Sequence, residues 1–257
     1  MLPRLATYQS RALPSYLILG TQRGGTTALH VSLAHHPQVL PPTRKEIQYF
    51  DRFYSLGSGW YRAHFPRHTD LAYLPGRGIT GEATANYLYD PRAPFRVQMT
   101  VPSAKLIVLI RNPIDRAFSA WKLLSRQGRE QRSFSHAIAA ELESAPDLEP
   151  ATFRRRPSPS YLARGRYEEQ LLRWYTHCDR HNLLVIPSEQ LFTHPEPIFD
   201  KITGFLDLVV WQPEAFRPVY STESRDLDSR MRLQLARYFA PHNERLQALV
   251  GEDLGWE

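Results

Sequence analysis

Residues 17–29, LILGTQRGGTTAL, contain the pattern that decides the fold. The apolar run Tyr16 to Leu19 predicts a buried strand, the small residues from Gly20 to Gly25 predict a loop, and Thr26 to Ala34 predicts a helix. Backbone N–H groups in such a loop point toward a bound anion, and the positive end of the helix dipole adds to the attraction. The stretch therefore predicts an anion-binding loop between a strand and a helix.

The loop spacing matches the phosphate-binding pattern G-x-x-x-x-G-K-[ST] in part. Gly20, Gly25 and Thr27 stand at the expected positions, but Thr26 stands where the pattern has lysine. The nearest cation is Arg23, inside the loop. The sequence thus predicts a phosphate loop that lacks its usual lysine.

Three more apolar runs follow, and predicted helices separate them. Lys105 to Ile110 is typical of a parallel strand covered on both faces, and residues 79–83 and 182–186 predict two further strands. This alternation predicts an α/β fold of the P-loop type, with three layers and a central parallel sheet flanked by helices. The later predicted helices cover residues 113–121, 133–143, 161–179, 195–205 and 228–250.

Length and composition favour one globular domain over residues 1–257, with residues 1–14 as an N-terminal extension. Residues 52–78 and 144–160, rich in proline and other loop-forming residues, predict irregular substrate-side loops. The 32 Lys and Arg residues against 26 Asp and Glu residues give a net charge of +6, which suits an anionic ligand. The same charge keeps nucleic-acid binding open.

The single cysteine, Cys178, excludes a disulfide within the chain. No run of 18 apolar residues occurs, and residues 1–20 lack the apolar centre of a signal peptide. We therefore expect no membrane insertion and a cytoplasmic location.

Two charged positions outside the loop are candidates for chemistry. Arg111 follows the strand 105–110, where a metal-dependent phosphotransferase would have an Asp for magnesium. A guanidinium there favours direct contact with a phosphate, which Ser119 is near enough to share. Glu46 stands between two basic residues and the aromatic pair 49–50. Spacing alone leaves two equal interpretations for Glu46, an exposed charge cluster or a carboxylate held near the loop.

The chain resembles the sulfotransferases that use 3′-phosphoadenylyl sulfate (PAPS), especially the heparan sulfate branch, over roughly residues 15–257. The motifs that carry the resemblance, in order, are LGTQRGGTT (19–27), KEIQYFD (45–51), GWY (59–61), EATANY (82–87), LIRNPIDRAFS (109–119), GRY (165–167) and YFAPHNERL (238–246).

The resemblance implies a role for each candidate residue. Arg23 stabilises the oxygen that leaves with the phosphate, and Glu46 is the general base on a hydroxyl or amine of a carbohydrate or other small-molecule acceptor. Arg111 and Ser119 bind the 3′-phosphate. The residues implied to bind the 5′-phosphosulfate are Gln22, Arg23, Gly24, Gly25, Thr26 and Thr27.

The implied chemistry agrees with the residue types. Sulfuryl transfer builds negative charge on the leaving phosphate oxygen, and a fixed cation with aimed N–H groups stabilises it. A carboxylate on the other side removes the acceptor proton. Because PAPS already carries a good leaving group, the resemblance implies PAPS as co-substrate, PAP (3′-phosphoadenosine 5′-phosphate) as product, and no required metal.

The chain departs from the family pattern at three places. Ala83 stands where the heparan sulfate enzymes have a lysine, and the late Lys-Gly-Arg loop is missing. Its nearest counterpart is Ser224-Arg225, so the closing role passes to Arg225. The family's disulfide is also absent, which implies a soluble bacterial relative. Gln48 resembles the N-sulfotransferase version of its motif and hints at an amine acceptor.

Two alternative functions follow from the same residues. A P-loop kinase for a small metabolite would use the loop with ATP and magnesium, but the sequence offers no good metal carboxylate at a strand end. A non-catalytic nucleic-acid-binding protein would use the net charge and the run 154–156, and it predicts salt-dependent affinity. No nucleic-acid module is recognisable, so we expect no nucleic-acid partner.

Overall fold

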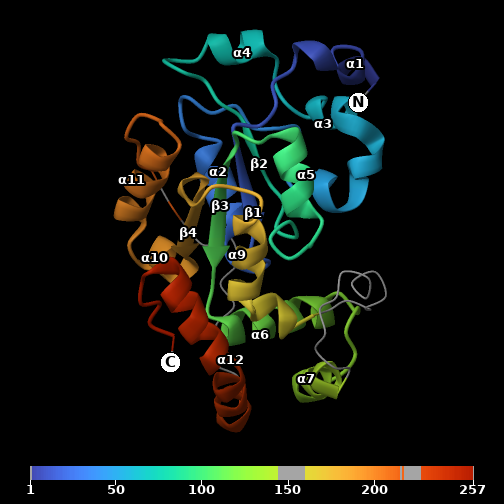
Figure 1. The fold of residues 1–257 in the computed structure, drawn as a ribbon, viewed down its shortest axis with the longest axis vertical. Helices are drawn as coiled ribbons and strands as arrows, with labels where there is room; N and C mark the ends of the chain where they lie inside the picture. The colour runs from blue at the N-terminus through green and yellow to red at the C-terminus, as the bar shows by residue number, and fades with distance from the viewer. Residues whose placement is uncertain (1, 144–159, 215, 217–226, 257) are drawn as a thin grey trace. The chain divides into compact units, whose positions relative to one another are not determined.

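The computed structural model describes residues 2–143, 160–214, 216 and 227–256 (Figure 1). Contacts divide the chain into two compact units, residues 1–110 with 173–220 and residues 111–172 with 221–257. The single domain expected over the whole chain stays a prediction. Residues 144–159 of one expected substrate-side loop, and Arg225, lie outside the described residues.

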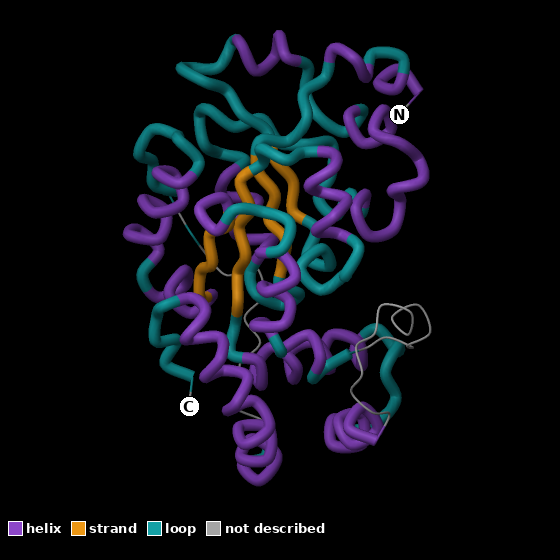
Figure 2. Tube along the Cα trace, in the orientation of Figure 1, coloured by secondary structure: helices purple, strands orange, loops and turns teal. Residues whose placement is uncertain are grey.

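Four parallel strands form the centre of the first unit: β1 (Tyr16–Gly20), β2 (Gly81–Ala83), β3 (Lys105–Ile110) and β4 (Leu183–Pro187). Their order is β2-β1-β3-β4, and Figure 2 shows them side by side. Tyr16 pairs with Gly81 on one side and Lys105 on the other, and Leu106 pairs with Leu183. The predicted central parallel sheet is therefore confirmed.

Helices cover this sheet because its strands are apolar on both faces. One face packs against α2 (Thr26–Leu33), α10 (Ser188–Thr193) and α11 (Pro195–Phe205). The strand residues on that face are Tyr16, Ile18, Ile107, Leu109 and Ile186. The alternate residues are equally buried, since Leu17 and Val108 are 0% exposed. Helices flank the sheet as predicted.

The segment 52–78 is more regular than expected. It contains η3 (Tyr54–Leu56), α3 (Gly57–Arg62) and α4 (His68–Ala72), so the prediction of an irregular loop was wrong there. Glycines at residues 57 and 59 hid the helical pattern, but Tyr61 and Phe65, four residues apart, are fully buried. Burial of these aromatic rings outweighs the low helix propensity of glycine. The remaining elements of the first unit are α1 (Leu2–Leu5), η1 (Tyr8–Ser10), η2 (Tyr49–Phe53), α5 (Ala93–Thr100) and η5 (Arg180–Asn182).

The second unit is helical, with α6 (Pro113–Arg126), α7 (Phe134–Glu143), η4 (Ala163–Gly165) and α12 (Ser229–Val250) around an aromatic core. The single helix predicted over 161–179 was wrong, because α9 covers only Tyr167–Tyr175. The chain bends before it, where a Cβ on Gly165 would lie 2.8 Å from atoms of Phe239 and Pro113. Close packing of the backbone at Gly165 therefore interrupts the helical pattern.

Candidate functional site

Residues 20–27, here called the glycine loop, connect the carboxyl end of β1 to α2. The N–H of Thr21 donates to the carbonyl of Leu109 at 2.6 Å, which ties the loop to the end of β3. The N–H of Gly24 donates to the carbonyl of Thr21 at 3.0 Å, and the Ser188 hydroxyl donates to the carbonyl of Gly24 at 2.6 Å. The loop is thus closed by its own backbone and by two neighbouring elements.

Two glycines of this loop stand where a larger residue would clash with its neighbours. A Cβ on Gly24 would lie 2.7 Å from Cγ2 of Thr21, and one on Gly25 would lie 2.8 Å from Cζ of Phe192. Gly25 also has φ +90°, a backbone conformation that favours glycine. It is the N-cap of α2 and brings no side chain to cap the helix. The first turn of α2 therefore begins without a side-chain cap, as in helices that receive an anion.

The other predicted loop ligands lie on this same continuous turn. Arg23 adopts φ 72° and is half-buried, as are Gln22 and Thr27, while Thr26 is 5% exposed. The six predicted phosphosulfate ligands are therefore contiguous in space as well as in sequence. A cation, a hydroxyl and backbone N–H groups on one turn can together bind a doubly charged anion.

Glu46 lies at the carboxyl end of β2. Its backbone N–H donates to the carbonyl of Ala83 at 3.0 Å, and its Oε1 accepts from the N–H of Ala85 at 3.3 Å. Lys45 Nζ lies 2.7 Å from the same oxygen, and the Glu46 side chain is 37% exposed. Because β2 pairs in parallel with β1, Glu46 and the glycine loop share one edge of the sheet. Both interpretations left open by spacing stay open, since Glu46 is part of a charged pair with Lys45 and is also held beside the end of β2; its role as a base stays a prediction.

A buried carboxyl group that the sequence did not reveal lies behind residues 46–50, here called the Glu46 segment. Glu82 is 0% exposed, and burial raises its pKa to about 7 against the stabilising hydrogen bonds that it accepts. Its Oε1 accepts from the hydroxyls of Tyr61 at 2.6 Å and Tyr87 at 3.0 Å, and its Oε2 accepts from the hydroxyl of Thr84 at 2.9 Å. In the sequence Glu82 stood out only as the first residue of the motif EATANY and as part of a short predicted strand, with no sign of its hydrogen-bond partners.

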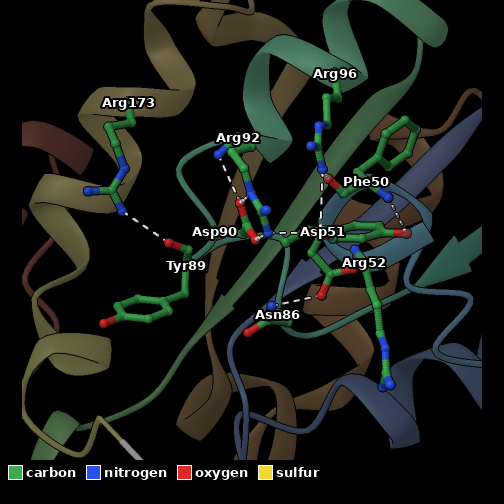
Figure 3. Close-up of polar contacts among 10 residues, drawn as sticks. Phe50, Asp51, Arg52, Asn86, Tyr89, Asp90, Arg92, Arg96 and Arg173 are labelled. Carbon is green, nitrogen blue, oxygen red and sulfur yellow. Dashed lines mark hydrogen bonds and ion pairs between the residues drawn. The ribbon is translucent and has the colours of Figure 1, made fainter. Parts of the chain in front are cut away.

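Arginines donate to carbonyl groups at the end of the Glu46 segment and directly after it (Figure 3). Arg96 Nη1 donates to the carbonyl of Phe50 at 2.6 Å, and Arg92 Nη2 donates to the carbonyl of Asp51 at 2.8 Å. Arg92 also forms an ion pair with Asp90 at 2.5 Å. The Asp51 side chain accepts from Asn86 at 2.7 Å. The backbone after Glu46 is therefore held by hydrogen bonds to its carbonyl groups as well as by the packing of its buried side chains.

Arg111 and Ser119, the predicted 3′-phosphate ligands, belong to the second unit. Arg111 is half-buried, and its carbonyl accepts from the Tyr167 hydroxyl at 2.9 Å. The helix α6 begins directly after it, capped by Asn112, whose Oδ1 accepts from the N–H of Ile114 at 3.0 Å. Ser119 lies within α6 and is 1% exposed. The roles of these two residues stay predictions, as does that of Arg225.

One group of side chains in the second unit has the spacing of a metal site. Ligand atoms of Glu168, Glu169 and His242 lie within 4.8 Å of one another among the described residues. Cations already contact both carboxylates, since Arg245 donates to Glu168 at 2.9 Å and Arg166 lies 3.4 Å from Glu169. We interpret this group as an ion-pair network between α9 and α12.

Comparison with known proteins identifies a family for most of the chain. The sulfotransferase domain family matches residues 13–222. The bifunctional heparan sulfate N-deacetylase/N-sulfotransferase 3 of Homo sapiens is 32% identical over 203 residues, which cover 77% of this chain and 22% of that protein. The membrane-associated sulfotransferase kil1 of Dictyostelium discoideum is 24% identical over an alignment of 317 positions, gaps included, that covers 95% of this chain and 67% of that protein. The chain thus spans about a fifth of the human relative.

A solved structure is similar along nearly the whole chain. The sulfotransferase from Alicyclobacillus acidocaldarius has a TM-score of 0.75 and 28% identity, covering 95% of this chain and 98% of that one. Its similarity supports the same arrangement of a parallel sheet and flanking helices. None of the helices in the described ranges has the length and apolar character needed to cross a membrane.

Proposed function

We propose that this chain, which belongs to the sulfotransferase family, transfers the sulfuryl group of PAPS to a hydroxyl or amine of a carbohydrate or other small-molecule acceptor. One observation carries the proposal. The glycine loop and the Glu46 carboxylate, an anion-binding turn and a proton acceptor, share the carboxyl edge of the same parallel sheet. Ligands of open α/β sheets bind at that edge.

In the proposed reaction the acceptor oxygen or nitrogen forms a bond to sulfur while the bond from sulfur to the leaving phosphate oxygen breaks. The acceptor proton passes to Glu46, and the electron pair of the broken bond stays with the product PAP. Arg23 and the N–H groups of the glycine loop stabilise the charge that grows on that phosphate. Lys45 Nζ lies 2.7 Å from Glu46 Oε1, so a cation stands beside the carboxylate to which the acceptor proton passes.

The donor is recognised by two groups of residues in this proposal. Residues 22–27 bind the 5′-phosphosulfate, and Arg111 with Ser119 binds the 3′-phosphate. A guanidinium supplies charge-assisted hydrogen bonds that an adenosine nucleotide without the 3′-phosphate cannot use. The family resemblance assigns nucleotide binding to Arg225 as well. No metal takes part, because the leaving phosphate is neutralised by Arg23 and by backbone dipoles.

Ala83 stands where the heparan sulfate enzymes have a lysine at the acceptor side, and it is fully buried in β2. Lys45 is a cation that already contacts the proposed base, and we assign it the charge that Ala83 lacks. Carbohydrates are the first acceptors to test, since heparan sulfate enzymes are among the relatives. Both hydroxyl and amine acceptors belong in that test.

The test of the donor is a thermal shift with PAP in the presence of a chelator. PAP is expected to raise Tm by mass action without magnesium, and adenosine 5′-phosphate, which lacks the 3′-phosphate, is expected to raise it less. No shift at millimolar PAP contradicts the proposal. A larger shift with ATP and magnesium than with PAP favours the small-molecule kinase instead.

The same protein preparation tests the alternative that the chain only binds nucleic acid. Such a protein would bind DNA or RNA with an affinity that falls steeply with salt, and it would not release PAP from PAPS. Release of PAP that depends on an added sugar, phenol or amine supports sulfuryl transfer and identifies the acceptor class.

A further inference from the structure

Backbone N–H groups at the start of η2 need partners that the π-helix itself does not supply. In η2 the N–H groups of Arg52 and Phe53 both donate to the carbonyl of Gln48, at 3.1 and 2.9 Å. The N–H groups of residues 48–50 lie at the N-terminus of this helix, before its first hydrogen-bonded N–H. Donors at a helix N-terminus have no partner within the helix. In this chain two side-chain hydroxyls accept from them.

Tyr87 accepts from two of these donors and Thr84 from the third. The N–H groups of Tyr49 and Phe50 donate to the Tyr87 hydroxyl at 2.8 and 3.4 Å. The N–H of Gln48 donates to the Thr84 hydroxyl at 3.3 Å. Because each hydroxyl accepts from the backbone, its own proton is directed elsewhere, and both hydroxyls donate to the carboxyl group of Glu82.

We propose that Glu82 is a positioning residue for the reaction: through the hydroxyls of Tyr87 and Thr84 it holds the Glu46 segment in the turn that presents the Glu46 carboxylate. The inference rests on the proposed function, because it assumes that Glu46 is the base. Glu82 itself is fully buried, so the role proposed for it is an indirect one.

The backbone of the Glu46 segment shows what this network has to hold. Glu46 and Gln48 have φ of 56° and 59°, in the left-handed region, which residues other than glycine adopt at a cost in free energy. Neither residue is glycine, so tertiary contacts must maintain the turn. A buried carboxyl group whose oxygens accept from three hydroxyls is a rigid anchor, since each lost partner would leave a buried polar group unsatisfied.

Tyr61 offers a matched control within the same network. Its hydroxyl donates to Glu82 Oε1 at 2.6 Å, and no contact joins that hydroxyl to the N–H groups of residues 48–50 in the described structure. Its ring stacks on Tyr49 with centroids 4.4 Å apart, a contact that phenylalanine keeps. Tyr61→Phe and Tyr87→Phe therefore remove the same kind of bond from the same carboxyl group, but only the second removes the link to the Glu46 segment.

The experiment compares Tyr87→Phe, Thr84→Val and Tyr61→Phe for kcat, PAP affinity and amide hydrogen exchange. We expect Tyr87→Phe and Thr84→Val to lower kcat by about 10- to 100-fold, as expected for misplacement of a reacting group. PAP affinity stays unchanged, and Tyr61→Phe keeps kcat within about threefold. In a Glu46→Gln background, Tyr87→Phe is expected to lower kcat no further, because the base through which it acts is absent.

The exchange measurement separates this inference from the proposed function. Tyr87→Phe should speed exchange at the amides of Tyr49 and Phe50, and Tyr61→Phe should not. Unchanged exchange in Tyr87→Phe overturns the inference even in an active enzyme. Equal losses of kcat in Tyr87→Phe and Tyr61→Phe, or a full additional loss in the Glu46→Gln background, reduce the network to a purely structural role. A wild-type chain that neither binds PAP nor turns over PAPS overturns the proposed function instead.

Discussion

The glycine loop and the Glu46 segment lie at the same edge of one sheet, yet different forces hold them. The loop is held by backbone bonds to Thr21 and Leu109, and its shape depends on glycines where a Cβ has no room. The Glu46 segment contains no glycine and takes its shape from hydroxyls anchored on the buried Glu82. The shape of the loop thus depends on its own backbone, whereas the shape of the Glu46 segment depends on hydrogen bonds to the core.

This difference has a consequence for mutation. Changes in the glycine loop should act on nucleotide affinity, because in the proposed function the loop supplies the N–H groups that bind the donor. Changes around the Glu46 segment should act on kcat, because they displace a group that works in the transition state. The four predictions below, in order of decreasing effect, test that separation.

Glu46→Gln is expected to lower turnover of PAPS by about 10²- to 10⁴-fold, the usual loss for a general base. PAP affinity should remain near wild type, because Glu46 does not belong to the loop. Steady-state kinetics and calorimetric titration with PAP measure the two quantities. Glu196→Gln, an exposed glutamate in the same unit, is the control. Unchanged turnover in Glu46→Gln would make Glu46 a structural residue only.

Arg111→Ala asks whether the glycine loop is the whole donor site. We expect PAP affinity to fall by about 10- to 100-fold, the loss of a charge-assisted hydrogen bond. Affinity for adenosine 5′-phosphate should change little, since that nucleotide has no 3′-phosphate. Arg129→Ala, at an exposed arginine of the same unit, should leave both affinities unaltered. A parallel loss for both nucleotides would remove the 3′-phosphate role of Arg111.

Gly25→Ala tests the loop itself. The new Cβ would meet Phe192 at 2.8 Å with φ at +90°, so we expect a lower Tm and a PAP affinity reduced about tenfold. Gly57→Ala is a matched control, because Gly57 has φ +79° and nothing within 4 Å of the added Cβ. It should lower Tm by a similar backbone cost while PAP affinity stays at the wild-type value. Equal affinity in the two variants would show that the loop tolerates the side chain.

The pH dependence of stability should have opposite signs in the two regions. Burial lowers the pKa of His30, in α2 after the loop, from 6.5 to about 4 and raises that of Glu82 from 4.5 to about 7. Below pH 6.5 the unfolded chain protonates at His30 before the folded one, so this contribution to stability is lost as pH falls toward 4. Between pH 4.5 and 7 folded Glu82 keeps a proton that the unfolded chain releases, so its contribution is lost as pH rises.

The measurement is Tm against pH for wild type, His30→Gln and Glu82→Gln. Relative to wild type, His30→Gln should lose less stability between pH 6.5 and 5, and Glu82→Gln should lose less between pH 5 and 7. Only the slopes are compared, so an offset in Tm from either substitution does not matter. Parallel curves for all three proteins would contradict both pKa shifts.

The strand, loop and helix at residues 16–34 could be predicted because local sequence controls them. A solid apolar run predicts a buried parallel strand, and small residues at Gly20 and Gly25 predict a tight turn. The structure agrees to within one residue, with β1 at Tyr16–Gly20 and α2 at Thr26–Leu33. The order of the strands was not readable from the sequence, since pairing joins residues as far apart as Leu106 and Leu183.

The surroundings of Glu46 could not be predicted for the same reason. Nothing in the residues 43–51 indicates that Glu82, 36 positions later, lies behind them as a buried acceptor for three hydroxyls. The helices inside 52–78 and the break at Gly165 were missed because packing of Tyr61 and Phe239 overrides local propensity.

The sequence alone determined that this chain would build a parallel sheet with a glycine-rich loop after its first strand, because apolar runs and glycines act within a few residues. Only the tertiary structure decided that the Glu46 carboxylate lies at the same sheet edge, with Ala83 and Ala85 holding its backbone and carboxylate. Pairing of β2 beside β1 brings these distant residues together, and Glu82 is fully buried among them. Such contacts depend on the whole core and leave no local pattern in the chain.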